Sequence, residues 1–233
     1  MSENEFEGRI PSSYGDLASL IYLDFSNNHL FGTIPEHLAM GCYSLWSLKL
    51  SNNNFSGQLF PAPLINQTSL NYLYLDNNHF WGKIPNCLSN IVRLWELDLS
   101  DNNLTGMLPR WLGNISSLVN IAMANNKLEG PIPQELCKLF KLEFLDLSEN
   151  RLSGSIPSCF NSSHIKHVHL QKNRLSGPLP SAFIDGFTLV TLDLSYNCLT
   201  GYLPDWMGNL STLSILLLRH NLLRGRISPH YAF

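Results

Sequence analysis

One asparagine returns at a nearly constant interval along this chain of 233 residues, with gaps of 23 to 25 residues between its ten copies. A unit of this length cannot bury its own apolar face, so neighbouring units must stack to form a core. The spacing therefore predicts a solenoid of ten turns and a single domain over 1-233. The repeated residues are Asn4, Asn28, Asn53, Asn78, Asn102, Asn126, Asn150, Asn173, Asn197 and Asn221.

Apolar residues recur at fixed distances before the repeated asparagine. In the unit of Asn150 they are Leu142, Leu145 and Leu147, which lie eight, five and three residues before it. The spacing of two between Leu145 and Leu147 is typical of a strand whose alternate side chains point inward. We therefore expect each turn to add one short strand to a parallel sheet.

The asparagine itself needs a hydrogen-bonded role, because a buried amide without partners is costly. We expect these side chains to form a ladder in which each amide binds backbone groups of its own turn and of a neighbouring turn. Glycine follows four residues after each asparagine, as Gly154 follows Asn150, and indicates a backbone turn. Proline follows seven residues after eight of the ten asparagines, where it suits a chain leaving a short strand.

These motifs together carry a family resemblance. The run from Leu142 to Pro157 reads Leu-x-x-Leu-x-Leu-Ser-x-Asn-x-Leu-Ser-Gly-x-Ile-Pro and resembles the plant-specific class of leucine-rich repeat. The segment Gly208 to Leu213 is similar to phrases in the ectodomains of plant receptor-like proteins and receptor kinases. The resemblance implies an α/β repeat fold, a right-handed solenoid with a concave parallel β-sheet that is uncapped at both ends.

The resemblance also implies a function without chemistry: a module of a plant cell-surface receptor for signalling or defence, with a peptide or protein ligand and a co-receptor. It implies no catalytic residue, no cofactor and no metal. The net charge of −3 and the absence of a dominant basic cluster argue against nucleic-acid or membrane binding. The alternatives are a secreted inhibitor of microbial cell-wall-degrading enzymes, similar to polygalacturonase inhibitors, and a truncated, non-functional fragment.

The chain begins and ends inside a repeat. Met1 occupies a strand column, and the sequence stops just after the Gly-x-Ile of the tenth unit. No signal peptide and no membrane-spanning run is present in the sequence. We therefore expect a piece of a larger ectodomain that lies on the extracellular face of the plasma membrane.

The outward positions of the strands are the default binding surface, and two groups of residues stand out on them. The first is aromatic and acidic and contains Tyr22, Tyr72, Tyr74, Glu96 and Asp98. Exposed tyrosines suit a peptide or protein partner, since aromatic anchors often dominate interface energy. For the tyrosines we favour binding, whereas an aspartate between two leucines is also repeat consensus.

The second group places His167 and His169 on one strand, with Asp146 and Asp193 on the neighbouring strands. Neighbouring carboxylates favour the charged imidazolium, so ligand binding sensitive to mildly acid pH is one interpretation. Solvated surface histidines are the plainer interpretation. A metal site is disfavoured because nothing orients the side chains as ligands.

Six Asn-x-Ser/Thr sequences predict glycosylation if the chain is secreted. They start at Asn54, Asn66, Asn103, Asn114, Asn161 and Asn209. Among five cysteines, Cys137 and Cys159 lie in consecutive turns at similar offsets from the repeated asparagine. A disulfide between them would add about 3 kcal/mol in the loop-entropy model, and two unpaired thiols are the alternative.

Overall fold

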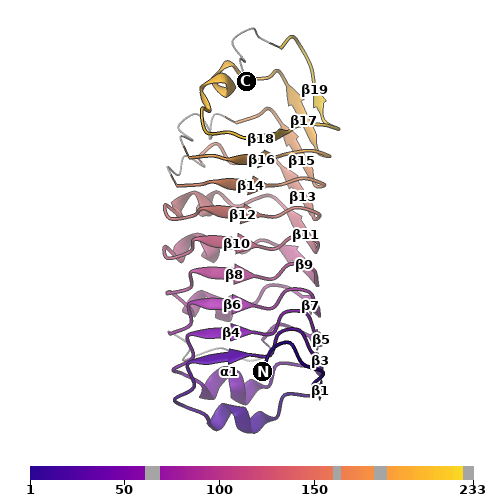
Figure 1. The fold of residues 1–233 in the computed structure, drawn as a ribbon. Coiled ribbons are helices and arrows are strands. Elements are labelled where there is room, and N and C mark those ends of the chain that lie inside the picture. Colours follow the sequence, from indigo (N-terminus) through magenta and orange to yellow (C-terminus); the bar gives the residue numbers. More distant parts are fainter. Residues whose placement is uncertain (61–68, 160–163, 181–187, 228–233) are drawn as a thin grey trace.

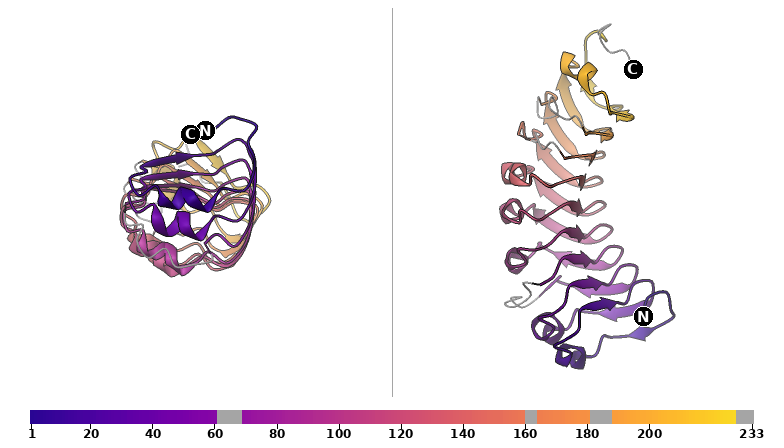
Figure 2. Two further views of the ribbon diagram at one scale, coloured as in Figure 1. Left: turned by 90° about the horizontal axis from the view of Figure 1, so that it is seen from below. Right: turned by 60° about the vertical axis from the view of Figure 1, so that its left-hand side comes forward.

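In the computed structural model, the repeats stack into one elongated solenoid, and the structure describes residues 1–60, 69–159, 164–180 and 188–227. Figure 1 shows the turns piled in chain order, with the first strands at one end and the last at the other. The stack is curved, and its helices lie on the convex side (Figure 2). The predicted fold class, a leucine-rich-repeat solenoid with a long parallel sheet, is correct.

In the described part of the chain, the predicted strands form a nine-stranded parallel sheet on the concave side. The strands lie in chain order, and the outward residues of neighbouring strands are direct partners. They are β2 (Tyr22–Asp24), β4 (Ser47–Lys49), β6 (Tyr72–Tyr74), β8 (Glu96–Asp98), β10 (Asn120–Ala122), β12 (Phe144–Asp146), β14 (His167–His169), β16 (Thr191–Asp193) and β18 (Ile215–Leu217).

A second parallel sheet, which the sequence analysis did not predict, runs along one flank of the stack. Each of its strands begins one to three residues after a ladder asparagine, and the described residues contribute ten of them. They are β1 (Glu7–Gly8), β3 (His29–Gly32), β5 (Asn54–Gly57), β7 (His79–Gly82), β9 (Asn103–Met107), β11 (Lys127–Gly130), β13 (Arg151–Gly154), β15 (Arg174–Gly177), β17 (Cys198–Gly201) and β19 (Leu222–Leu223).

Short helices complete the turns. Each begins directly after one of the repeated prolines, whose extended backbone and missing N–H suit the residue before a helix. The repeated glycine, four residues after each ladder asparagine, has a positive φ in all ten turns, as the turn prediction requires. The helices are η1 (Ser12–Asp16), α1 (Glu36–Gly41), η2 (Asn86–Asn90), η3 (Arg110–Asn114), η4 (Gln134–Lys138) and η6 (Asp205–Asn209).

The ladder asparagine joins each turn to the turn before it. Asn126 is buried, and its Nδ2 donates to the carbonyl oxygens of Leu99, Met123 and Ala124 at 2.9, 3.4 and 3.1 Å. Its Oδ1 accepts from the backbone N–H of Leu104 at 2.9 Å, in the preceding turn. The same pattern recurs at the asparagines from Asn53 to Asn197. These bonds fix the strand register, so the outward residues of the nine-stranded sheet form straight rows.

Candidate functional site

The most continuous group of aromatic side chains on the concave sheet spans its first four strands. We call this group the aromatic cluster; it contains Tyr22, Trp46, Tyr72, Tyr74 and Trp95. Its ring centroids lie 5.2 Å apart for Tyr22 and Trp46, 4.5 Å for Trp46 and Tyr72, and 6.0 Å for Tyr72 and Trp95. Tyr22 and Trp95 remain 63% and 46% exposed, so apolar ring surface faces solvent across four turns.

The two tryptophans were missed by the sequence analysis because they lie one residue outside the regular strand alternation. The backbone N–H groups of Trp46 and Ser47 both donate to the carbonyl of Ile21, at 2.8 and 3.1 Å. Trp95 and the residue after it share the carbonyl of Asn71 in the same way. This shared acceptor breaks the period of two. Both tryptophans precede their ladder asparagine by seven residues, a signal that the sequence does contain.

Charged and hydroxyl groups border the aromatic cluster on its C-terminal side. The Tyr74 hydroxyl donates a hydrogen bond to Glu96, and the Lys49 Nζ lies 5.1 Å from the centre of the Tyr74 ring. Burial and the Glu96 hydrogen bond both raise the pKa of Tyr74 far above its ordinary value. Tyr74 therefore stays neutral and is held in place from both sides, which presents a fixed edge to a ligand.

Asp98 lies beside this edge and has an unusual carboxyl group. Burial raises its pKa from 3.8 to about 6, although the backbone N–H of Ser100 donates to it at 2.9 Å and opposes the rise. The negative charge of Asp76 on the neighbouring turn raises the pKa further. A cationic group on a ligand would favour the ionised form, so binding and deprotonation of Asp98 are coupled.

The second predicted group is also assembled by the strand register. His169 pairs across the sheet with Asp146 on one side and with Asp193 on the other. Its Nδ1 lies 3.6 Å from the Asp146 carboxylate, and its Nε2 lies 3.0 Å from the Thr191 hydroxyl. That same hydroxyl lies 2.9 Å from Nδ1 of His167. These five residues form the histidine cluster.

In the histidine cluster, His169 and the neighbouring carboxylates each favour the charged form of the other. The Asp146 carboxylate, 3.6 Å away, raises the pKa of His169, burial opposes this, and the Asp193 charge adds to the rise. Burial would raise the pKa of Asp146, but His169 and the hydrogen bonds from Ser148 prevail and lower it. The pair is thus an ion pair over part of the acid range. In the described ranges, no group of three His, Cys, Asp or Glu side chains has metal-site geometry.

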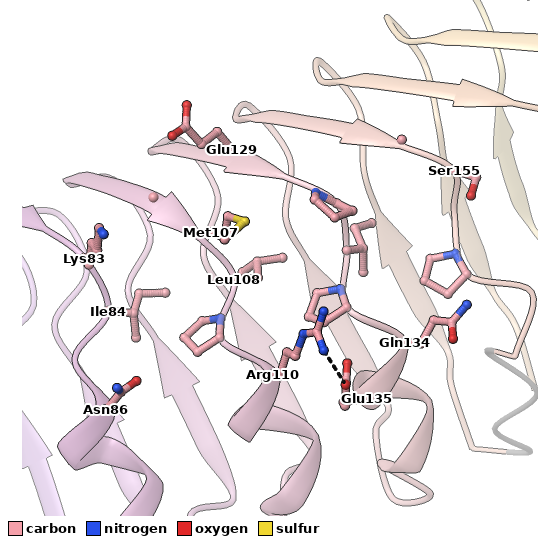
Figure 3. A pocket seen from close by; sticks show the side chains of 17 residues that line it. Lys83, Ile84, Asn86, Met107, Leu108, Arg110, Glu129, Gln134, Glu135 and Ser155 are labelled. Atoms are coloured by element: carbon pink, nitrogen blue, oxygen red, sulfur yellow. Dashed lines mark ion pairs between the residues drawn. The ribbon is translucent and has the colours of Figure 1, made fainter.

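A hollow of about 920 Å³ lies away from both clusters, along the flank (Figure 3). Met107 and Glu129 line it from the ten-stranded sheet, Lys83 lines it just after β7, and Arg110 and Glu135 lie 3.8 Å apart at its helical side. None of the predicted concave residues lines this hollow. We place the candidate ligand site on the concave sheet instead, since the hollow has no comparable group of contacting aromatic rings.

The predicted glycosylation sites fall in two places. Asn54 and Asn103 are the first residues of β5 and β9 on the ten-stranded sheet. Asn114 and Asn209 are the last residues of η3 and η6, and both are exposed. Asn66 and Asn161 lie outside the described residues.

The structure joins Cys137 and Cys159 in a disulfide, with their Cα atoms 5.5 Å apart. The bond lies on the helical side of the stack and connects the turns whose concave strands are β10 and β12. It therefore ties the turn that carries Asp146 of the histidine cluster to the turn before it. No corresponding cross-link is present among the described residues of the first four turns.

Three comparisons place this geometry among known proteins. The family described as "Leucine rich repeat" matches residues 92–152 and 163–223, more than half of the chain, and a second description of the repeat matches 19–40, 44–64 and 69–91. The chain belongs to the leucine-rich-repeat family. The chain is similar to plant members of that family, among them receptor-like proteins and receptor kinases.

Among curated relatives, Receptor-like protein 13 of Arabidopsis thaliana is 43% identical over 61 residues, which cover 26% of this chain and 6% of that protein. The Arabidopsis receptor kinase HAESA, solved with the peptide hormone IDA and the co-receptor SERK1, superposes with a TM-score of 0.91 at 33% identity. That superposition covers 96% of this chain and 37% of HAESA. The plant peptide hormone receptor RGFR1, in complex with RGF2, gives 0.88 at 33% identity over 98% of this chain and 40% of the receptor.

These matches show that the chain is homologous to plant leucine-rich-repeat receptor ectodomains and spans well under half of their length. The chain therefore resembles the binding modules of these receptors, and no catalytic domain is evident in it. In the described ranges, no helix has the length and apolar character needed to cross a bilayer.

Proposed function

We propose that this chain is the ligand-recognising part of a plant cell-surface receptor and that it binds a peptide on the concave face of the nine-stranded sheet. The observation that carries the proposal is the aromatic cluster, a row of contacting rings that four successive strands hold partly exposed to solvent. Homology to HAESA and RGFR1, each solved with a peptide hormone, supports a ligand of this class.

The geometry of the cluster suits an extended peptide. Neighbouring concave strands lie about 4.8 Å apart, so rings from four strands follow a line across the strands. An extended peptide along that line can place apolar side chains on Trp46 and Tyr72, while Glu96 and Asp98 offer acceptors for a cationic side chain. Aromatic anchors surrounded by polar groups are the usual centre of a binding site.

The proposal extends to partners and location. HAESA was solved with a co-receptor, and we propose that the larger protein containing this chain also signals through a co-receptor on the extracellular face of the plasma membrane. The concave tyrosines would then contact the ligand, and the co-receptor would contact surfaces that a fragment of this size need not contain.

A selection from a random peptide library tests the proposal. The wild-type chain is used for selection, and a Trp46→Ala/Tyr72→Ala variant is used to remove peptides that do not need the aromatic cluster. A His167→Ala/His169→Ala variant is the matched control, because it changes two outward residues of the same sheet. Peptides that bind the wild type and the control, but not the aromatic variant, support the proposal. Peptides that bind all three proteins equally, or none after saturating selection, contradict it.

A further inference from the structure

The flank formed by the ten-stranded sheet carries exposed aromatic side chains that the peptide site does not use. Phe31 is 47% exposed and Trp81 is 52% exposed. Single exposed apolar side chains are common on protein surfaces, so their neighbours decide whether they have a role. Each of these two residues lies directly beside a predicted glycosylation site on the next strand.

The strand register places each of the two aromatic residues directly opposite an asparagine of a glycosylation sequence. Phe31 on β3 is the cross-strand partner of Asn54 on β5, and Trp81 on β7 is the partner of Asn103 on β9. Partners on neighbouring parallel strands lie about 4.8 Å apart and point to the same face. Thr105 points to that face as well, because it follows Asn103 by two residues in the same strand.

The surroundings of Asn103 leave room for a sugar ring. Trp81, Asn103 and Thr105 line a hollow of about 730 Å³, together with Gln58, Gly82, Lys83, Pro85 and Lys127. The amides of Asn54 and Asn103 make no hydrogen bond within the part of the chain that the structure describes. Lys83 also lines the larger hollow of about 920 Å³ shown in Figure 3.

We propose that Asn103 carries an N-linked oligosaccharide whose first sugar packs on the indole of Trp81, and that Asn54 and Phe31 form a second site of the same kind. The C–H face of a pyranose ring is apolar enough to cover an aromatic face, while its hydroxyl groups stay in water or reach the lysines at the rim of the hollow. The proposal explains why these aromatics are exposed. It rests on the extracellular location given under the proposed function.

Attachment forms a bond between Nδ2 of Asn103 and the anomeric carbon of the first sugar. Nδ2 loses one proton, and the lipid diphosphate that activates the oligosaccharide leaves. The donor is thus a lipid-linked oligosaccharide diphosphate supplied by the secretory pathway, and no oxidant or reductant is involved. The other described sequons differ, since Asn114 and Asn209 end short helices and have no exposed aromatic residue across a strand.

The test uses the full chain secreted from a plant cell line, with occupancy at each sequon measured by peptide mass spectrometry. Thermal unfolding is then compared before and after an endoglycosidase that leaves one sugar and an amidase that removes every sugar. We expect occupancy at Asn103 and Asn54. We also expect no change in Tm after trimming to one sugar, and after complete removal a fall of about 2–4 °C for each of the two stacking contacts at this chain length.

The variants assign any shift to the proposed contact. Trp81→Ala and Asn103→Gln should each reduce the fall in Tm by the same amount, because the two changes remove the same contact. Asn114→Gln is the matched control and should leave the shift unchanged. An unmodified Asn103 overturns the proposal, as does a shift in Trp81→Ala that is as large as the shift in the wild type. Peptide binding measured on the same preparations separates this outcome from a failure of the proposed function.

Discussion

The two halves of the concave sheet share one backbone and carry different chemistry. From β2 to β8 the outward residues form a row of contacting aromatic rings, whereas from β10 to β18 they form the histidine cluster and a more aliphatic end. Inward residues, ladder asparagines and glycines are nearly identical in both halves. The comparison teaches that the repeat determines the scaffold, and that only the outward rows distinguish one part of the surface from another.

The largest expected effect tests whether the two halves share a scaffold. Leu73 and Leu192 occupy the same inward position on β6 and β16, and neither is exposed. Each change to alanine leaves a cavity and should lower the free energy of unfolding by about 2–5 kcal/mol. Urea unfolding measures the change. A cost several times larger in one half would break the comparison, because the two cores would then not be equivalent.

The ladder gives a smaller effect of the same kind. Asn78 accepts from the Phe55 N–H and donates to Leu50 at 2.9 Å, and Asn173 accepts from the Leu152 N–H and donates to Leu147 at 2.9 Å. Substituting alanine for either asparagine strands these buried backbone groups.

We expect each ladder substitution to cost about 1–3 kcal/mol by urea unfolding. The exposed residue Asn77, which precedes a ladder asparagine, is the control position, and Asn77→Gly should have little effect because its φ is +50°. A neutral effect of both ladder substitutions would mean that other groups or water satisfy the backbone.

The sequence predicts the inward residues and the ladder of both halves, but it does not predict all of their outward surface. Inward leucines such as Leu145 and the asparagines recur because burial and register permit few alternatives. Trp46 and Trp95 were missed because two consecutive N–H groups share one carbonyl, which breaks the alternation used to assign faces. The ten-stranded sheet was missed because its strands span only two to five residues and most of them end at the repeated glycine, which indicates a turn. Which outward side chains contact one another required coordinates.

The pH dependence of stability also distinguishes the two halves, because each half contains a different residue with a shifted pKa. The pKa of Asp98 is about 3.8 in the unfolded chain and is raised to about 6 in the folded one. Its contribution to the free energy of unfolding is therefore fully present below about 3.8 and is lost as the pH rises through 6. The folded-state pKa of His169 is raised from 6.5, so its contribution is present below 6.5 and is lost above the raised value. Both terms therefore favour mildly acid pH.

We expect Tm to rise as the pH is lowered from 8 to 5. Asp98→Asn should flatten the part of the curve between about pH 4 and 6, and His169→Gln should flatten the part above 6.5. Below pH 4 the trend should reverse in part, because the pKa of Asp146 is lowered and its contribution is lost as the carboxylate becomes protonated. Scanning calorimetry at steps of one pH unit measures the Tm over all three pH ranges. A curve unchanged by both variants would show that neither group is coupled to folding.

The most direct test of the central claim is the affinity of one selected peptide for two variants of the same sheet. Titration calorimetry with the tightest-binding library peptide gives the dissociation constant for the wild type, Tyr72→Ala and His167→Ala. The account predicts that Tyr72→Ala weakens binding by tenfold or more, on the order of 1.4 kcal/mol or above, and that His167→Ala changes it by less than about twofold. Strong weakening by His167→Ala with Tyr72→Ala unchanged would contradict the assignment of the binding site to the aromatic cluster.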